Sequence, residues 1–185
     1  MAQARLSRVA TALFAVAIAI GVACQPTAAP KTSAEIAAES LERGVQADTA
    51  GRVDEAIAAY FQVLSNEPKN KFAFYNLGQV YRRANELVIA EGYYRQALKV
   101  DPNFVAALFG YGFTRLAAAD WAEAERANKA VTTAEPQNAP AWFNLGLALQ
   151  NQSKQSEATQ AFQRARQIDP NLTPPPAPTP RPSGR

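Results

Sequence analysis

The side chains that most often carry catalysis are scarce in this sequence. It contains no histidine and one cysteine, Cys24, so it lacks the usual general base and the commonest metal ligand. The carboxylate pair Asp54-Glu55 stands before an apolar run, where acidic residues favour the start of a helix. No serine or cysteine nucleophile has a base close by, and no glycine-rich phosphate loop or metal-ligand cluster occurs. The sequence therefore predicts a protein that is not an enzyme and needs no metal or cofactor.

The remaining reactive group, the thiol of Cys24, follows an N-terminal apolar run. Arg5 and Arg8 precede the apolar residues 9–23, and polar sequence begins at Gln25. A basic start, a short apolar stretch and an exit at small residues are typical of a secretory signal peptide, here residues 1–23. The apolar run is shorter than the roughly 20 residues that a membrane-spanning helix needs.

The sequence Ile20-Gly21-Val22-Ala23-Cys24 resembles a bacterial lipobox. This resemblance implies that the thiol is acylated and that cleavage leaves Cys24 as a lipidated N-terminus, with residues 24–33 as a tether to the membrane. Gly21 departs from the motif, which prefers leucine there. The alternatives are ordinary secretory cleavage after Ala23 and an uncleaved signal anchor. Gln25 stands where enterobacterial lipoproteins of the inner membrane have aspartate, which favours the outer membrane.

The charge distribution argues against a nucleic-acid partner. The formal net charge is +3, but residues 37–170 hold 14 Lys and Arg against 15 Asp and Glu. A protein that binds nucleic acid should concentrate positive charge on its folded surface. We therefore expect no nucleic-acid binding, and the alternative of an RNA-binding helical repeat is the weaker one.

Three residue types recur with a period of 34 over four copies. The recurring positions are Gly44, Gly78, Gly112 and Gly146; Ala56, Ala90, Ala124 and Ala158; and Pro68, Pro102, Pro136 and Pro170. Such a period indicates a stacked repeat architecture. Small residues suit places where paired helices cross closely, and each proline suits the end of a helix.

The period and its marks resemble the tetratricopeptide repeat, W-x₂-L-G-x₂-Y, then A-x₃-F, then P. The second copy carries Phe74, Leu77, Gly78, Tyr81, Ala90, Tyr94 and Pro102, and the fourth carries Trp142, Leu145, Gly146, Leu149, Ala158, Phe162 and Pro170. The third copy departs at Arg115 and Asn128, and the first at Ser40, Arg43 and Ala47. The resemblance implies an all-α, right-handed α-solenoid over residues 34–170, with repeats at about 37–70, 71–104, 105–138 and 139–170.

Capping residues and turn residues predict the helix boundaries. Thr32 with Glu35, and Asp120 with Glu123, fit caps at helix starts, while Gly51 and Asn85 fit tight turns. The eight helices are expected at 34–49, 52–66, 71–84, 86–99, 104–118, 121–134, 139–151 and 154–168.

In this family the ligand usually lies in a concave groove lined by the first helix of each hairpin. The groove residues are then Phe72, Tyr75, Gln79, Arg82, Arg83, Phe109, Phe113, Phe143 and Leu147, with Leu41, Val45, Asp48, Leu116 and Gln150 beside them. Tyr75, Phe109 and Phe143 share one repeat position and form an aromatic ladder, which either binds a partner or completes the core. Arg82 and Arg83 either pair with an acidic group of the ligand or form a solvated helix end.

These features predict an adaptor that binds another protein and is anchored in the bacterial cell envelope. A secreted or signal-anchored adaptor without a lipid is the alternative. Residues 171–185 are rich in proline and predict a disordered tail. Because no capping helix follows residue 170, the outer face of the last helix, near Ala161, Ala165 and Ile168, is expected either to be partly uncovered and able to dock a partner or a second copy, or to be screened by Lys154, Arg164 and Arg166.

Overall fold

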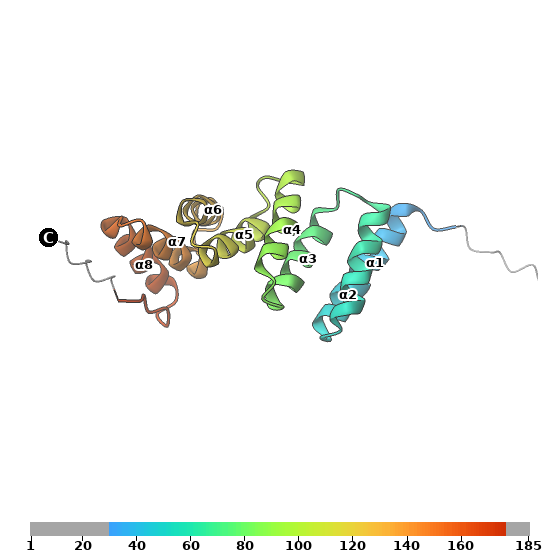
Figure 1. The fold of residues 1–185 in the computed structure, drawn as a ribbon, viewed down its shortest axis with the longest axis horizontal. Coiled ribbons are helices and arrows are strands. Elements are labelled where there is room, and N and C mark those ends of the chain that lie inside the picture. Colours follow the sequence, from blue (N-terminus) through green and yellow to red (C-terminus); the bar gives the residue numbers. More distant parts are fainter. Residues whose placement is uncertain (1–29, 177–185) are drawn as a thin grey trace, which may run out of the picture. The chain divides into compact units, whose positions relative to one another are not determined.

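The computed structural model describes residues 30–176, and this part of the chain is all-α, as predicted (Figure 1). Each of its helix bounds lies within one residue of the predicted bound. The helices are α1 (Ser33–Thr49), α2 (Val53–Asn66), α3 (Lys71–Arg83), α4 (Leu87–Val100), α5 (Val105–Ala117), α6 (Trp121–Ala134), α7 (Ala139–Asn151) and α8 (Gln155–Ile168).

Several predictions concern residues outside the described range. The signal peptide at 1–23, the lipidated Cys24, most of the tether and residues 177–185 of the tail all belong to this group. They stay predictions.

None of the helices between residues 30 and 176 is long and apolar enough to cross a membrane.

Local sequence accounts for where the helices begin and turn. Thr32 Oγ1 accepts a hydrogen bond from the Glu35 N–H, and the Glu35 carboxylate accepts one from the Thr32 N–H, which together form the predicted capping box of α1. The Asp120 side chain caps α6 at the Glu123 N–H. Within each hairpin one residue has a left-handed backbone, and these residues also repeat every 34 positions: Gly51, Asn85, Ala119 and Ser153. The period therefore fixes the turn geometry even where alanine must adopt a positive φ.

Close packing between aromatic rings and glycines holds each hairpin together. A Cβ added to Gly78 would lie 2.6 Å from Cε1 of Tyr94, and one added to Gly44 would meet Tyr60 at the same distance. Tyr60 and Tyr94 are fully buried. The ring of Tyr94 also faces Gly110 of the next repeat, whose added Cβ would lie 2.5 Å from it. Tyr94 therefore joins the second and third repeats as well as the two helices of its own hairpin.

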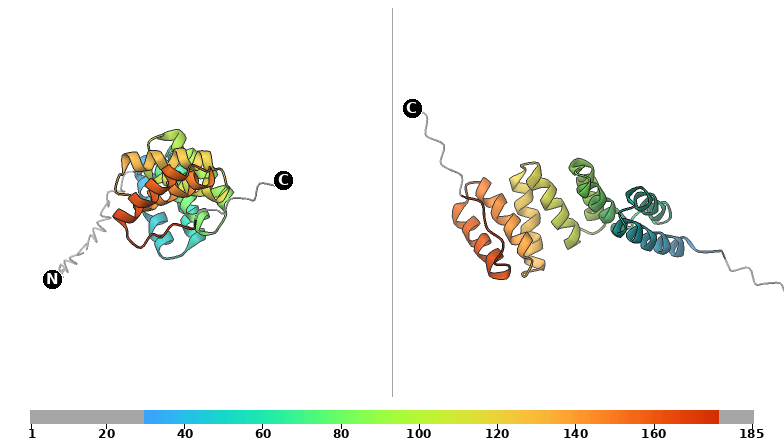
Figure 2. Two further views of the ribbon diagram at one scale, coloured as in Figure 1. Left: turned by 90° about the vertical axis from the view of Figure 1, so that its left-hand side faces the viewer. Right: turned by 90° about the horizontal axis from the view of Figure 1, so that it is seen from below.

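The hairpins stack through their first helices. Within residues 31–176, α1 contacts α3, α3 contacts α5 and α5 contacts α7, whereas the even-numbered helices do not contact one another. Helices α2, α4 and α6 instead each pack between their own hairpin partner and the first helix of the next repeat, and α8 packs against α7 (Figure 2). The odd-numbered helices therefore form the inner layer of the stack and the even-numbered helices the outer layer.

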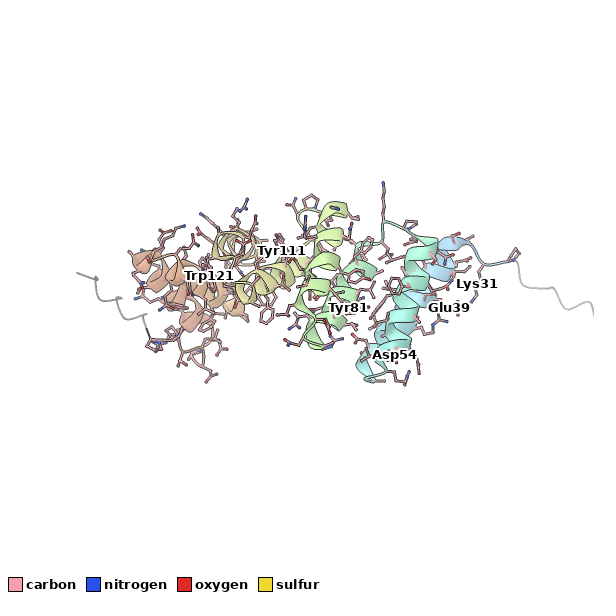
Figure 3. All side chains as sticks on the ribbon, viewed as in Figure 1. Lys31, Glu39, Asp54, Tyr81, Tyr111 and Trp121 are labelled. Carbon is pink, nitrogen blue, oxygen red and sulfur yellow. The ribbon has the colours of Figure 1, made fainter. Side chains whose placement is uncertain are left out.

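Ion pairs connect successive repeats. Glu91 on α4 pairs with Arg115 on α5, and Glu125, one period later on α6, pairs with Lys154 at 2.7 Å. The Arg115 guanidinium also lies 5.0 Å from the ring centroid of Tyr111, whose place on α5 is labelled in Figure 3. This explains why the third copy tolerates an arginine where other copies have Tyr81 or Leu149: its charge is matched by the preceding repeat.

Asn128, the other departure in the third copy, occupies the position of Tyr60, Tyr94 and Phe162 in the other repeats. It is fully buried, and its Nδ2 donates to the Ala124 carbonyl at 2.8 Å, while its Oδ1 has no hydrogen-bond partner. We have no physical account of this choice.

Candidate partner-binding groove

The inner layer brings the predicted groove residues onto three neighbouring helices, α3, α5 and α7. Of these residues Phe72 and Phe113 are the most open aromatic side chains, 48% and 38% exposed. Tyr75, Phe109, Phe143 and Leu147 are half-buried, and so is Arg82. The inner surface formed by these residues is therefore partly apolar and partly polar, and its most exposed aromatic side chains lie on α3 and α5.

A hydrogen-bonded network centred on Gln79 organises the second repeat. The Gln79 Nε2 donates to Tyr75 Oη at 2.9 Å, and its Oε1 accepts from Tyr94 Oη at 2.6 Å and from Arg82 Nε at 3.0 Å. One carboxamide thus holds Tyr75, Arg82 and the buried Tyr94 in fixed relative positions. Because Tyr94 is locked between two glycines, this network is anchored to the core and does not depend on a ligand.

Arg82 remains free to accept a negatively charged group. Its guanidinium carbon lies 5.4 Å from the ring centroid of Phe113 on the next first helix. No carboxylate lies within 4.0 Å of its nitrogens in the part of the chain that the structure describes. A cation held over an exposed aromatic ring is a preorganised site for a carboxylate flanked by apolar groups.

Arg83 behaves differently from Arg82. Its guanidinium pairs with the carboxylate of Asp48 at the end of α1, a residue also predicted to line the groove. Neither of the two interpretations proposed from the sequence describes this arrangement, because the partner is a residue of the preceding repeat. The pair links the first two repeats. Among the described residues at this end of α3, Arg82 is therefore the arginine without an ion-pair partner.

The aromatic ladder is largely engaged in packing. The Tyr75 ring centroid lies 5.4 Å from that of Phe104 and 6.2 Å from that of Tyr94. Phe143 packs 5.5 Å from Phe162, inside the cluster that also includes Leu147. For these positions the contacts favour the core interpretation over a free binding strip.

The sequence predicted Phe72 at the start of α3 as a groove residue but did not indicate its aromatic neighbour Phe104. Phe72 contacts Phe104 edge to face, with centroids 5.5 Å apart, and the Lys71 ammonium lies within 5.3 Å of both ring centroids. The same ammonium contacts Asp101 at 2.5 Å, and this hydrogen bond, with one from the Asn103 N–H, lowers the pKa of Asp101. Phe104 does not occupy a consensus position of the repeat, so the sequence pattern did not indicate a role for it. In the structure it lies beside Phe72.

The last hairpin is covered in a way that the sequence did not predict. Ala161 and Ala165, expected on an open outer face, are buried within the hairpin, and only Ile168 is half-buried. The prediction assigned these alanines to the wrong face of α8. They follow Ala158 at helical spacing and therefore lie with it on the face that packs against α7. The prediction of an uncovered apolar face at these alanines is therefore wrong.

Residues 172–176 return along the last hairpin (Figure 2). The Gln150 Nε2 donates to the Pro176 carbonyl at 3.5 Å, and a pocket of about 290 Å³ lies between this segment and α8, lined in part by Phe162, Pro174 and Pro175. Gln150, predicted beside the groove, is only 7% exposed. The segment therefore covers part of the last hairpin on the side that has no following repeat within the described residues.

Hairpins of one 34-residue period, stacked through an inner layer of first helices, define a tetratricopeptide-repeat protein. Residues 41–169 match the model of the family described as the middle TPR-like domain of cilia and flagella-associated protein 70, and the chain belongs to this family.

Solved structures agree on the fold. MamA from Desulfovibrio magneticus RS-1, from residue 41 to its end, superposes with a TM-score of 0.69 at 22% identity, over 75% of this chain and 78% of that one. PilF from Pseudomonas aeruginosa superposes with a TM-score of 0.65 at 22% identity, over 76% of this chain and 64% of that one. A comparison with curated protein sequences finds no match.

In the described residues no group of three or more His, Cys, Asp or Glu side chains is placed to hold a metal ion.

Proposed function

We propose that this chain is an adaptor that binds a segment of another protein in its inner groove and thereby assembles a complex of the bacterial cell envelope. One observation carries the proposal: Arg82 is fixed by Gln79 over the exposed ring of Phe113 and has no carboxylate partner in the described residues. A partner segment with an apolar side chain next to a carboxylate matches this pair of groups. A preorganised site of this kind lowers the entropy lost on binding.

Photocrosslinking from the groove tests the proposal. A photoreactive amino acid replacing Phe113 should yield a covalent adduct with a partner protein in cells, whereas the same amino acid at Gln160, exposed on α8 in the outer layer, should not. Arg82→Ala should weaken capture of that partner by about tenfold, the effect of losing one charge-assisted contact. Arg82 and Phe113 serve better than the ladder residues, because Tyr75 and Phe143 also support the core.

Mass spectrometry identifies the adduct, and thermal unfolding shows that each variant is folded. Equal adducts from residues 113 and 160, or full capture by Arg82→Ala, would contradict a binding site in the groove.

We further propose that diacylglycerol on Cys24 anchors the adaptor outside the cytoplasm, at the outer membrane or the outer face of the inner membrane. The proposal is supported by the basic start, the short apolar run and the single cysteine at its end. Intact-mass measurement of the membrane-extracted protein should find an acylated N-terminal Cys24. Cys24→Ser should release the protein from the membrane fraction. A mature chain that starts at an unmodified Cys24, or that retains residues 1–23, would instead support the secreted or signal-anchored alternative.

A further inference from the structure

The first turn of α4 exposes apolar side chains in the outer layer. Val88 is 84% exposed and Ile89 is 44% exposed, and Gly92 lies one turn further along and is also exposed. We call these three residues the α4 platform. Neither the repeat pattern nor the inner groove uses them.

The other three repeats place different residues at these positions. Val88 corresponds to Asp54, Ala122 and Ser156, and Ile89 corresponds to Glu55, Glu123 and Glu157. Asp54 lies at the solvent-facing start of α2 (Figure 3). Acidic residues in a first turn interact favourably with the helix dipole, and α4 has none there. The second repeat has therefore replaced a stabilising polar helix start by exposed valine and isoleucine.

No contact within the described part of the chain requires a glycine at position 92. An added Cβ on Gly44, Gly78, Gly110, Gly112 or Gly146 would come within 3.0 Å of a neighbouring side chain, so close packing requires each of those glycines. A Cβ on Gly92 would meet nothing within 4 Å. Glycine inside a helix is less stable than alanine, and the other repeats have Ala58, Arg126 and Gln160 at this position. A helical glycine without an internal contact leaves room for another backbone to approach α4 from outside.

Two positively charged side chains lie on the same face of α4, further toward its C-terminal end. Arg95 and Lys99 follow Val88 and Gly92 at helical spacing, and both are exposed. Arg95 has only a 3.7 Å contact with Glu91, which is already paired with Arg115, and Lys99 forms no ion pair in the described residues. This face of α4 therefore presents an exposed apolar part, Val88 and Ile89 beside Gly92, followed by the cations Arg95 and Lys99.

We propose that the α4 platform docks an amphipathic helix of a second partner protein, with small and apolar side chains over Gly92 and acidic side chains opposite Arg95 and Lys99. Charge complementarity selects an acidic partner, and the open glycine selects a helix that can approach closely. The site lies in the outer layer and does not depend on ligand binding in the groove. An adaptor with both sites would hold two proteins at once.

A designed peptide tests the platform directly. The probe is a helical peptide of about 20 residues with an Ala/Leu face and glutamates beyond it, and its control replaces every glutamate by lysine. Titration of the full chain, followed by fluorescence anisotropy and by the Gly92 amide signal in NMR, should show binding of the acidic peptide alone. Val88→Asp combined with Ile89→Glu, which restores the helix start of α2, should weaken binding at least about tenfold, and so should Gly92→Leu.

The same variants separate docking from stability. The Val88→Asp/Ile89→Glu and Gly92→Leu proteins should unfold at the same or a higher temperature than the wild type, because no core contact is lost. Unchanged peptide affinity in these variants, equal binding of the lysine peptide, or a marked fall in unfolding temperature would each overturn the proposal. So would concentration-dependent self-association that Gly92→Leu abolishes, since the occupant would then be a second copy of this chain.

Discussion

Replacing Gly78 by alanine is expected to lower the free energy of unfolding by about 2 kcal/mol, although alanine is the better helix former. The added Cβ would lie 2.6 Å from the Tyr94 ring. That ring cannot move aside, because Gly110 packs on it from the next repeat and Gln79 holds its hydroxyl. Urea unfolding followed by circular dichroism measures the loss.

The matched control is Gly92→Ala, which makes the same chemical change in the neighbouring helix. It should raise the free energy of unfolding by up to about 1 kcal/mol, since its Cβ meets open space. Gly112→Ala should fall between the two, because its neighbour is the smaller side chain of Asn128. A similar change in stability at Gly78 and Gly92 would mean that helix propensity, and not the close approach of the helices, decides these positions.

The protein is expected to lose stability steeply between pH 10 and pH 12. Burial raises the pKa of both Tyr60 and Tyr94 to about 12, and the nearby Asp48 carboxylate adds to the effect at Tyr60. Tyrosine in the unfolded chain ionises near pH 10, so the folded state holds these protons more tightly than the unfolded state does. The stabilisation is complete below pH 10 and disappears as the pH rises through 12, at about 2 to 3 kcal/mol per tyrosine.

Tyr60→Phe removes one of the two tyrosines whose pKa is raised to about 12. The Tyr60 hydroxyl is buried without a hydrogen-bond partner, so its removal should cost little at pH 7. The alkaline loss should shrink by about 2 to 3 kcal/mol, while Tyr94, and Tyr93 and Tyr111, whose pKa values burial also raises, keep their contributions. Tyr94→Phe is a less clean variant, because it also removes the hydrogen bond to Gln79. Unfolding free energies at pH 8 and pH 11, with tyrosinate absorbance as the measure of ionisation, test this expectation. An equal alkaline loss in Tyr60→Phe and wild type would contradict it.

The fold was predictable because local and periodic signals agree. The prolines at positions 68, 102, 136 and 170 each lie two residues beyond the end of a helix, and the glycines of the repeat mark the helix crossing within each hairpin. Thr32 and Asp120 cap helices where their sequence context predicts. These signals act over a few residues or over one period, so a single sequence contains them in full.

The groove was less predictable, because contacts between repeats decide which of its side chains are packed and which are exposed. The position of Tyr75 in the repeat follows from the period, but its packing against Phe104 depends on how two repeats meet. The pairing of Arg83 with Asp48 likewise joins separate repeats and has no local pattern. The proline-rich composition of residues 172–176 suggested disorder, yet backbone and side-chain contacts with α7 and α8 place them on the last hairpin.

The ion pairs between repeats have a consequence for how this array can change length. Glu91 and Glu125 occupy the same repeat position, and each faces a cation of the following repeat. Excising residues 105–138 as one unit would bring Glu91 opposite Lys154 and remove Arg115 together with Asn128. A gene that loses this unit would thus encode a shorter array in which these charges are still matched. The same excision would place Asn144 where Gly110 now packs on the Tyr94 ring, so Asn144→Gly is the accompanying change that a shortened array needs.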